Sequence, residues 1–424
     1  MIKPSPKAIK TPMIAETTNH YDFIITGASG NIGRHLIPIL AKNGRKVLAV
    51  SRNSASLRML YAGLEGVDVA DYEFLANQQI CHTLVHLAVR NNNQSGSLND
   101  FIRDNVDFST WICAQFNRMG GQRFVNIASI QSLDDANTSY YAISKRIAQQ
   151  CVKDIIGDKL DNVYIGYFHG KSYFGKRLSP LNSAGIVGKY IFDVFKIIKP
   201  STSLGIIADH LLKLDFTPNK IYILTDDLLK SSAYRYAVRA TDIIVSISIL
   251  LLLIPFLIII YALIRIDSPG PVVFAQARVG KHQALFTLYK FRTMKRDTIA
   301  AGTHEVSVSA VTRVGRFLRK TKLDELPQAI NLLRGEMTLV GPRPCLPVQE
   351  ELINARSVLG VYTMKPGITG YAQIRDIDMS RPQELANSDH IYMKLQSLSL
   401  NLKIILLTAF GRGRGDKVAL PKDL

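Results

Sequence analysis

The stretch Phe23-Ile-Ile-Thr-Gly27-Ala-Ser-Gly30-Asn-Ile-Gly33 places three glycines directly after a short apolar run and at the start of a helical pattern. Gly27 permits a tight turn, Gly30 lets the backbone approach a pyrophosphate, and Gly33 allows the helix to pack closely on the strand. The N-terminus of the following helix favours an anion. A strand, three glycines and a helix in this order predict a dinucleotide-binding α/β domain.

Around this stretch, short β-type runs alternate with longer helical patterns from Tyr21 to about Leu224. We expect strands at Phe23–Ile25, Lys46–Val50, Thr83–His86, Arg123–Ile127, Val163–Tyr167 and Ile221–Leu224, and helices at Asn31–Asn43 and Asn99–Arg118. This alternation predicts a parallel sheet covered by helices. We assign residues 21–230 to this domain, after a polar arm at 1–20 that lacks the apolar core of a signal peptide.

The residue after the second expected strand bears on the choice of cofactor. Arg52 stands where a carboxylate would bind the ribose hydroxyl of NAD. An arginine suits a 2′-phosphate instead, which indicates NADP. An ordinary surface arginine is the alternative.

Tyr141-Ala-Ile-Ser-Lys145 puts a tyrosine and a lysine on one helix face, and Ser129 follows the strand expected to end at Ile127. The ordinary pKa of a Tyr phenol is about 10. A neighbouring Lys cation lowers the phenol pKa by stabilising the phenolate. We therefore expect Tyr141 to move a proton at a sugar hydroxyl or ketone while a cofactor moves hydride, with Ser129 hydrogen-bonded to the same oxygen.

These residues resemble the short-chain dehydrogenase/reductase superfamily, in particular its nucleotide-sugar epimerase/dehydratase branch. The resemblance includes Val67-Asp68-Val-Ala-Asp71, similar to an adenine-contacting acidic segment, and His86-Leu87-Ala88, similar to the HLA motif. It implies a Rossmann-type fold that binds NAD(H) or NADP(H). The cofactor-binding residues would be Gly27, Gly30, Gly33, Arg52 and Asp68, and the catalytic residues Ser129, Tyr141 and Lys145. A domain that binds the cofactor without catalysis stays open.

The charge of the chain narrows the class of its partners. The net charge is +18, and residues 231–424 contain 26 basic and 15 acidic residues. This excess favours lipid head groups and phosphorylated substrates, and no RNP, zinc-finger or helix-turn-helix pattern supports nucleic acid. The four cysteines are scattered (Cys81, Cys113, Cys151 and Cys345), which favours a reducing compartment without a structural metal.

Ile243–Ile264 is an apolar run long enough to span a bilayer as a straight helix. Pro255 lies in its middle, where it removes a hydrogen bond and kinks a helix. Arginines flank the run on both sides, so the positive-inside rule gives no direction. A re-entrant helix that enters and leaves the same leaflet fits both observations, and a kinked single span stays open. We assign residues 231–266 to this membrane helix.

The remaining residues, 267–424, carry short polar blocks: Asp267-Ser-Pro-Gly-Pro271, Lys290-Phe-Arg292-Thr-Met294, Asp324-Glu325-Leu-Pro327-Gln328, Val340-Gly-Pro-Arg343-Pro344 and Pro366-Gly-Ile-Thr-Gly370-Tyr-Ala-Gln373. Asp324 and Glu325 fall where a helix is expected to begin, with Asp324 at or near its N-cap. One interpretation of these two carboxylates is simply the capped start of a surface helix. Clustered cations near a membrane segment favour a metal–phosphate site instead, since a carboxylate attacks phosphorus only where the phosphate charge is neutralised. Asp324 would then be a nucleophile that forms an acyl phosphate.

Through these blocks, residues from about 234 to 410 resemble the bacterial sugar transferase family, the monotopic polyprenyl-phosphate phosphoglycosyl transferases. The resemblance implies a mainly α, membrane-associated domain with a re-entrant helix. Asp324 would attack the sugar-bearing phosphate of a UDP-sugar and expel UMP, and undecaprenyl phosphate would then take the sugar phosphate. Glu325 would complete a catalytic dyad and Asp324 would bind Mg²⁺. The phosphate contacts would be Lys290, Arg292 and Arg343. Asn401 stands where the family often has Asp.

Together these patterns predict a fused enzyme on membrane lipids at the cytoplasmic face of a bacterial inner membrane. Its α/β domain would modify a UDP-sugar near C4, and its second domain would begin a capsule, O-antigen or exopolysaccharide unit. Two alternatives stay open. The α/β domain would be a non-catalytic sensor of NADP(H) or a UDP-sugar, or the chain would be a membrane-anchored reductase with an inert C-terminal half. The sugar and the oligomeric state stay open.

Overall fold

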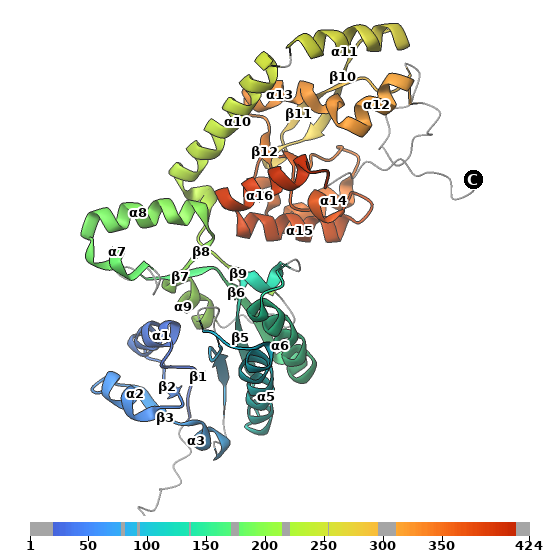
Figure 1. Ribbon diagram of the computed structural model, residues 1–424. Coiled ribbons are helices and arrows are strands. Elements are labelled where there is room, and N and C mark those ends of the chain that lie inside the picture. The colour runs from blue at the N-terminus through green and yellow to red at the C-terminus, as the bar shows by residue number, and fades with distance from the viewer. Residues whose placement is uncertain are drawn as a thin grey trace, which may run out of the picture. The chain divides into compact units, whose positions relative to one another are not determined.

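The computed structural model describes residues 20–77, 81–90, 94–134, 137–170, 178–213, 221–252, 254–295 and 311–412. The polar arm expected at residues 1–20 lies, apart from His20, outside the described residues. The chain divides into two compact units, Met1–Lys171 with Ser203–Leu224, and Ser172–Thr202 with Thr225–Leu424. Figure 1 shows the elements of both units.

The first unit is built on a seven-stranded sheet in the order β3-β2-β1-β4-β5-β6-β9, in which every pairing is parallel. Its strands are β1 Phe23–Thr26, β2 Val47–Val50, β3 Val67–Ala70, β4 Thr83–His86, β5 Arg123–Ser129, β6 Leu160–Ile165 and β9 Ile221–Leu224. The predicted parallel α/β class is confirmed. β3 is not among the predicted strands, because Asp68 interrupts its apolar pattern.

Helices cover both faces of this sheet (Figure 1). On one face, α1 (Asn31–Lys42) and α9 (Leu204–Leu212) pack with Ile25, and on the other, α5 (Phe108–Arg118) and α6 (Tyr140–Ile156) pack with Ile24. Successive strand residues point to opposite faces, which is why both are buried. The remaining elements are α2 Ser54–Leu60, α3 Tyr72–Asn77, α4 Leu98–Ile102, a π-helical turn η1 Arg103–Asp107, η2 Ile130–Leu133, η3 Gly157–Lys159 and β7 Tyr167–His169.

The second unit contains the apolar run, now as two helices, α10 (Ser232–Leu252) and α11 (Ile254–Asp267), with a bend of 63° between them. Among the described residues, no single helix is long and apolar enough to cross a bilayer, whereas this bent pair together is. Pro255 lies in the first turn of α11, where its missing N–H breaks no helical hydrogen bond. The bend agrees with a re-entrant helix and with a kinked single span, so both alternatives stay open.

The rest of the second unit is mainly helical, as expected, with an antiparallel hairpin that the sequence reading did not predict. Strands β10 (Val273–Val279) and β11 (Leu285–Phe291) form the hairpin, and β12 (Thr338–Val340) pairs in parallel with β13 (Gly367–Thr369). The helices are α7 Ser179–Ser183, α8 Gly185–Ile198, α12 Arg313–Thr321, α13 Ala329–Arg334, α14 Glu350–Val358, α15 Pro382–Leu395 and α16 Leu398–Ala409. Short elements are β8 Ser201–Ser203, η5 Leu228–Lys230, η6 Lys281–Gln283, η8 Leu323–Gln328, η9 Val361–Thr363 and η10 Gln373–Arg375.

Candidate functional site

In the first unit, the turn between β1 and α1 leaves no room for side chains at Gly27 and Gly33. Gly27 has a φ of 70°, and a Cβ there would lie 2.6 Å from the backbone nitrogen of Ala88. A Cβ on Gly33 would lie 2.7 Å from the carbonyl oxygen of Ala28. Gly30 is the N-cap residue of α1, so the first N–H groups of this helix are available to an anion. This backbone has the form of a phosphate-binding turn, and the role of each glycine stays a prediction.

Arg52 and Asp68 lie differently with respect to this turn. Arg52 is exposed and directly follows Ser51, whose hydroxyl donates to Ser29 in the glycine turn at 3.0 Å. Asp68 instead accepts a hydrogen bond of 2.8 Å from the hydroxyl of Tyr21. Tyr21 precedes the amino end of β1, whereas the glycine turn follows its carboxyl end. Arg52 thus follows a residue that contacts the turn, whereas Asp68 is bonded to a residue before the amino end of β1, and the contacts of both with a cofactor stay predictions.

Ser129, Tyr141 and Lys145 gather where β5 ends and α6 begins. Ser129 is the last residue of β5 and hydrogen-bonds the side chain of Tyr141, while Lys145 is only 4% exposed. Burial lowers the pKa of Lys145 to about 7. Burial also raises the pKa of Tyr141, against a smaller lowering by the Ser129 hydrogen bond. The predicted lowering of the tyrosine pKa by Lys145 is not found: the Ser129 hydrogen bond is the lowering influence on Tyr141, and burial outweighs it.

A buried polar network behind Lys145 was not predicted. Asn105, in the π-helical turn, accepts from the backbone N–H of Arg90 at 2.7 Å and donates to Ser144 at 2.9 Å. The imidazole of His86 contacts the hydroxyl of Ser109 at 3.0 Å. Burial, with the nearby Lys145 cation, lowers the pKa of His86 to about 3, so the ring is neutral at neutral pH. Sequence spacing carries no signal for this network, since its partners meet only through tertiary packing.

In the second unit, Asp324 and Glu325 lie in the helical turn η8, which packs on β11 and continues into α13. The N-cap of η8 is Lys322, with a φ of 59°, and Pro327 lies within the turn. Asp324 is only 8% exposed. The alternative of a capped surface helix is therefore wrong, because Asp324 is neither the cap nor on the surface.

The carboxylate of Glu325 lies close to cationic side chains from two other segments of the chain. Its Oε1 lies 3.1 Å from Nζ of Lys290 on β11 and 3.7 Å from Nη2 of Arg343 in the loop after β12. The three side chains are largely shielded from solvent, which strengthens their mutual attraction. Tertiary structure thus brings together Glu325, Lys290 and Arg343, with Asp324 adjacent in the chain.

Arg292, the third predicted phosphate contact, binds backbone instead. Its Nη1 donates to the carbonyl oxygen of Pro269 at 3.0 Å and its Nη2 to that of Ser268 at 2.5 Å. The side chain is buried. These bonds fasten the loop after α11 to the end of β11. The geometry gives Arg292 a structural role and does not support its predicted contact with phosphate.

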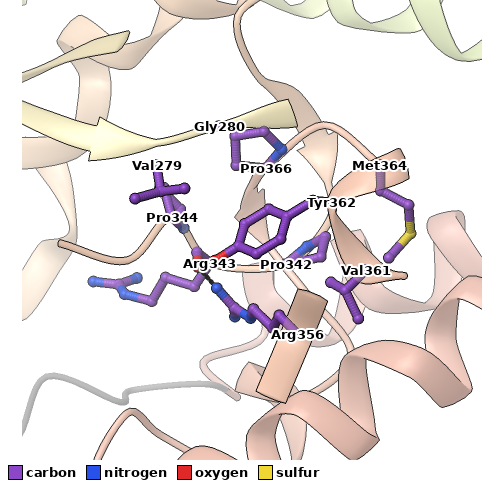
Figure 2. A pocket seen from close by; sticks show the side chains of 10 residues that line it. All are labelled: Val279, Gly280, Pro342, Arg343, Pro344, Arg356, Val361, Tyr362, Met364 and Pro366. Atoms are coloured by element: carbon purple, nitrogen blue, oxygen red, sulfur yellow. Dashed lines mark hydrogen bonds between the residues drawn. The ribbon is translucent and has the colours of Figure 1, made fainter. Parts of the chain in front are cut away.

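The backbone of Arg343 is held by a buried ion pair that the sequence reading missed. Nε and Nη2 of Arg356 donate to Oδ2 of Asp389 at 2.9 and 2.7 Å, and Nη1 donates to the carbonyl oxygen of Arg343 at 2.9 Å. A small pocket, in which Arg343, Arg356 and Tyr362 lie close together, adjoins this point (Figure 2). Arg356 and Asp389 belong to none of the motifs, so their pairing is visible only in the folded unit.

The two carboxylates of η8 bear on the predicted magnesium ion. Within the described part of the chain, no group of three or more His, Cys, Asp or Glu side chains could hold a metal ion. Mg²⁺ at phosphate sites commonly takes only one or two carboxylates, with waters and substrate phosphates as the other ligands. Asp324 and Glu325 supply two adjacent carboxylates, which meets this requirement.

Comparison with known proteins matches both halves of the chain. The family models for bacterial sugar transferases and for the NAD dependent epimerase/dehydratase family match residues 233–413 and 23–191. A UDP-glucose:undecaprenyl-phosphate glucose-1-phosphate transferase of Caulobacter vibrioides is 34% identical over 219 residues, which cover 49% of this chain and 81% of that relative. The chain belongs to the bacterial sugar transferase family. As predicted, this sugar transferase also carries an epimerase-type domain.

Other relatives of this sugar transferase differ in how much of them it covers. A UDP-glucose:undecaprenyl-phosphate glucose-1-phosphate transferase of Escherichia coli K12 is 34% identical over 62% of this chain, and the chain spans 56% of that relative. The exopolysaccharide production protein PSS of Rhizobium leguminosarum bv. phaseoli is 38% identical, over 42% of this chain and 96% of that protein. Among solved structures, Bordetella bronchiseptica WbmG in complex with NAD and UDP has a TM-score of 0.37 at 15% identity, over 49% of this chain and 73% of that one.

Proposed function

We propose that the second unit transfers a sugar 1-phosphate from a UDP-sugar to undecaprenyl phosphate. The observation that carries the proposal is the placement of Glu325 between Lys290 and Arg343, beside the buried Asp324. Two cations beside two carboxylates match a diphosphate substrate attacked by a carboxylate. The Escherichia coli and Caulobacter relatives, which are UDP-glucose:undecaprenyl-phosphate glucose-1-phosphate transferases, support the same donor and acceptor classes.

In this mechanism a carboxylate oxygen of Asp324 attacks the sugar-bearing phosphorus. The bond from that phosphorus to the oxygen bridging the two phosphates breaks, and UMP leaves. An oxygen of undecaprenyl phosphate then attacks the same phosphorus, the acyl-phosphate bond breaks, and Asp324 is regenerated with the sugar on a diphosphate-linked lipid. Glu325 orients Lys290 and Arg343 toward the phosphate oxygens. Mg²⁺, held by Asp324 and Glu325, would neutralise phosphate charge when bound.

The apolar run supports a proposal for the location of the enzyme. Residues 231–266 would enter the bacterial inner membrane and return to the same leaflet, so that residues 267–424 lie at its cytoplasmic face, where UDP-sugars are made. The bend of 63° between α10 and α11 supports this arrangement. The fused domain that binds NAD(H) or NADP(H) would lie within residues 21–230, with the glycine turn and Arg52 as its cofactor contacts.

Two activities remain for that fused domain. The hydrogen bond between Ser129 and Tyr141 beside Lys145 favours reduction or epimerisation of a UDP-sugar. The raised pKa of Tyr141 favours the alternative of a non-catalytic module that senses NADP(H) or a UDP-sugar and regulates the transferase. Turnover of UDP-4-keto-sugars with NADPH by the full chain supports the reductase, and saturable cofactor binding without turnover supports the sensor.

UMP release from a panel of UDP-sugars, with undecaprenyl phosphate, Mg²⁺ and the full chain in detergent, tests the transferase. Asp324→Asn should abolish release, because an amide is a poor nucleophile, whereas Glu351→Gln at an exposed position of α14 should leave it unchanged. A covalent adduct on Asp324, detected by mass spectrometry without acceptor, would support the proposed intermediate. Full activity of Asp324→Asn would refute the mechanism, and wild type without UMP release would favour the membrane-anchored reductase.

A further inference from the structure

Helix α8 exposes an apolar face that none of the proposed activities uses. Six apolar residues are exposed on it, three of them by more than 60% (Ile186, Val187 and Tyr190) and the others less (Ile191, Val194 and Ile198). At 3.6 residues per turn these six positions share one arc of about 140°. No charged residue falls within that arc. A contiguous apolar surface of this kind marks an interaction site.

The charges around this face favour a negatively charged partner. Lys189 and Lys196 lie to one side of the apolar arc, and Lys199 directly follows the helix. Asp193 is the single acidic residue of α8, and it pairs with Lys196 at 2.7 Å. An apolar face bordered by lysines is typical of helices that lie in the head-group region of a membrane.

Two hydrogen bonds tie α8 to the start of the bent apolar pair. Ser399, in the first turn of α16, donates to the carbonyl oxygen of Ile198 at 2.6 Å. Two residues later, Asn401 donates to the hydroxyl of Tyr234, near the beginning of α10, at 3.2 Å. The end of α8 is therefore anchored close to the point where the proposed membrane segment begins.

The face of α16 continues the apolar surface. Leu402 and Leu406 on α16 and Phe410, the C-cap of this helix, recur every four residues and are exposed, with Lys403 beside them. Two helices joined at Ile198 and Ser399 thus present apolar residues with neighbouring lysines.

We propose that α8 lies in the surface of an anionic bilayer, in the leaflet that α10 enters, as a membrane contact separate from α10 and α11. α8 lies outside residues 233–413, the part matched by the sugar transferase family, so the contact is a feature of this fused chain. The inference rests on the proposed entry of α10 and α11 into the bilayer.

Fluorescence quenching by lipid tests this contact in the full chain. An environment-sensitive dye is attached to a single introduced cysteine, at Val194 on the apolar arc, at Lys189 on the other side of the helix, or at Ile258 on α11. Cys151→Ser removes the partly exposed native thiol, while the other three cysteines are buried. The protein is reconstituted into phosphatidylethanolamine–phosphatidylglycerol vesicles with or without doxyl-labelled lipid.

We expect loss of emission with doxyl lipid at positions 194 and 258 and little loss at 189. Quenching at 258 without quenching at 194 would overturn the proposal for α8 and leave the membrane pair intact. Absence of quenching at positions 194 and 258 would overturn the proposal for α8 and also the proposed entry of α10 and α11 into the bilayer. A blue-shifted, unquenched dye at 194 would overturn the proposal in favour of a protein partner. If the blue shift then increases with the density of protein in the vesicles, the partner that covers α8 is a second copy of the chain. If the shift does not change with protein density, the partner is the N-terminal unit.

Discussion

Replacing Asp389 by Leu should loosen the second unit and disturb the proposed active site at the same time. Asp389 lies at the end of the chain of contacts that runs through Arg356 to the backbone of Arg343. Both partners of the ion pair are nearly inaccessible, with Arg356 only 1% exposed. The substitution therefore leaves a buried guanidinium without its counter-ion.

The size of the effect follows from this burial. Breaking a buried ion pair by removing one partner costs about 3–5 kcal/mol, and Arg cannot escape the cost by losing its proton. Arg356→Met should lower the free energy of unfolding by less than Asp389→Leu does. Burial already raises the pKa of Asp389, so the carboxyl group left without its partner can take up a proton and become neutral. Replacing both by Leu and Met should be close to neutral for stability, since a well-packed apolar pair avoids both desolvation penalties.

The assay needs a probe in each unit. Cys345 is fully buried in the cluster that includes Ala355 and Leu385, so its alkylation rate, mapped by mass spectrometry, reports opening of the second unit. A loss of 3–5 kcal/mol corresponds to about a hundredfold to several-thousandfold faster alkylation. Trp111 on α5 is the single tryptophan of the chain, so its fluorescence in denaturant reports on the first unit and serves as the internal control.

Activity separates stability from positioning. Arg356→Met and the double variant remove the hydrogen bond to the Arg343 carbonyl oxygen, and Asp389→Leu removes the carboxylate that holds Arg356 in place for it. UMP release should therefore fall about tenfold to a hundredfold in all three variants. The double variant should then combine near-normal protection of Cys345 with low activity. Full UMP release by a stable double variant would refute the positioning role of the ion pair.

Three further outcomes are expected in the first unit. Burial lowers the pKa of Lys145 from 10.5 in the unfolded chain to about 7 in the folded chain. Between pH 7 and pH 10.5 the unfolded state therefore binds up to about one more proton than the folded state. The free energy of unfolding should rise with pH over this range, by at most about 1.4 kcal/mol per pH unit. Lys145→Met should remove this rise, measured by Trp111 fluorescence in denaturant. Gly27→Ala should destabilise the unit by more than Gly44→Ala in the same measurement, because both glycines have a positive φ but only at Gly27 would a Cβ strike backbone. Arg52→Asp should weaken NADPH binding about tenfold or more relative to NADH in fluorescence titrations, and unchanged selectivity would mean that Arg52 is only a surface residue.

Local patterns along the chain were sufficient for the fold class and for most strands of the first unit. Fully buried parallel strands read as apolar runs, and the glycine turn has a steric reason that is independent of distant residues. β3 was missed because only one of its four residues is fully buried and one, Asp68, is charged and exposed. A break in the apolar run at Pro255 was predictable for a similarly local reason, since proline is tolerated in the first turn of a helix but not in its interior.

Side-chain contacts between residues far apart in the sequence could be found only from the tertiary structure. Motif content pointed equally to Lys290, Arg292 and Arg343, and only packing shows that two of them reach Glu325 while Arg292 binds carbonyl oxygens. The ionisation of Tyr141 was also misjudged, because the desolvation that governs its pKa depends on what covers it. Sequence alone thus determined which chemical groups this chain carries and which local turns they occupy. Their partners and their solvent exposure were set by the fold, since both arise from segments that meet only when the chain is packed.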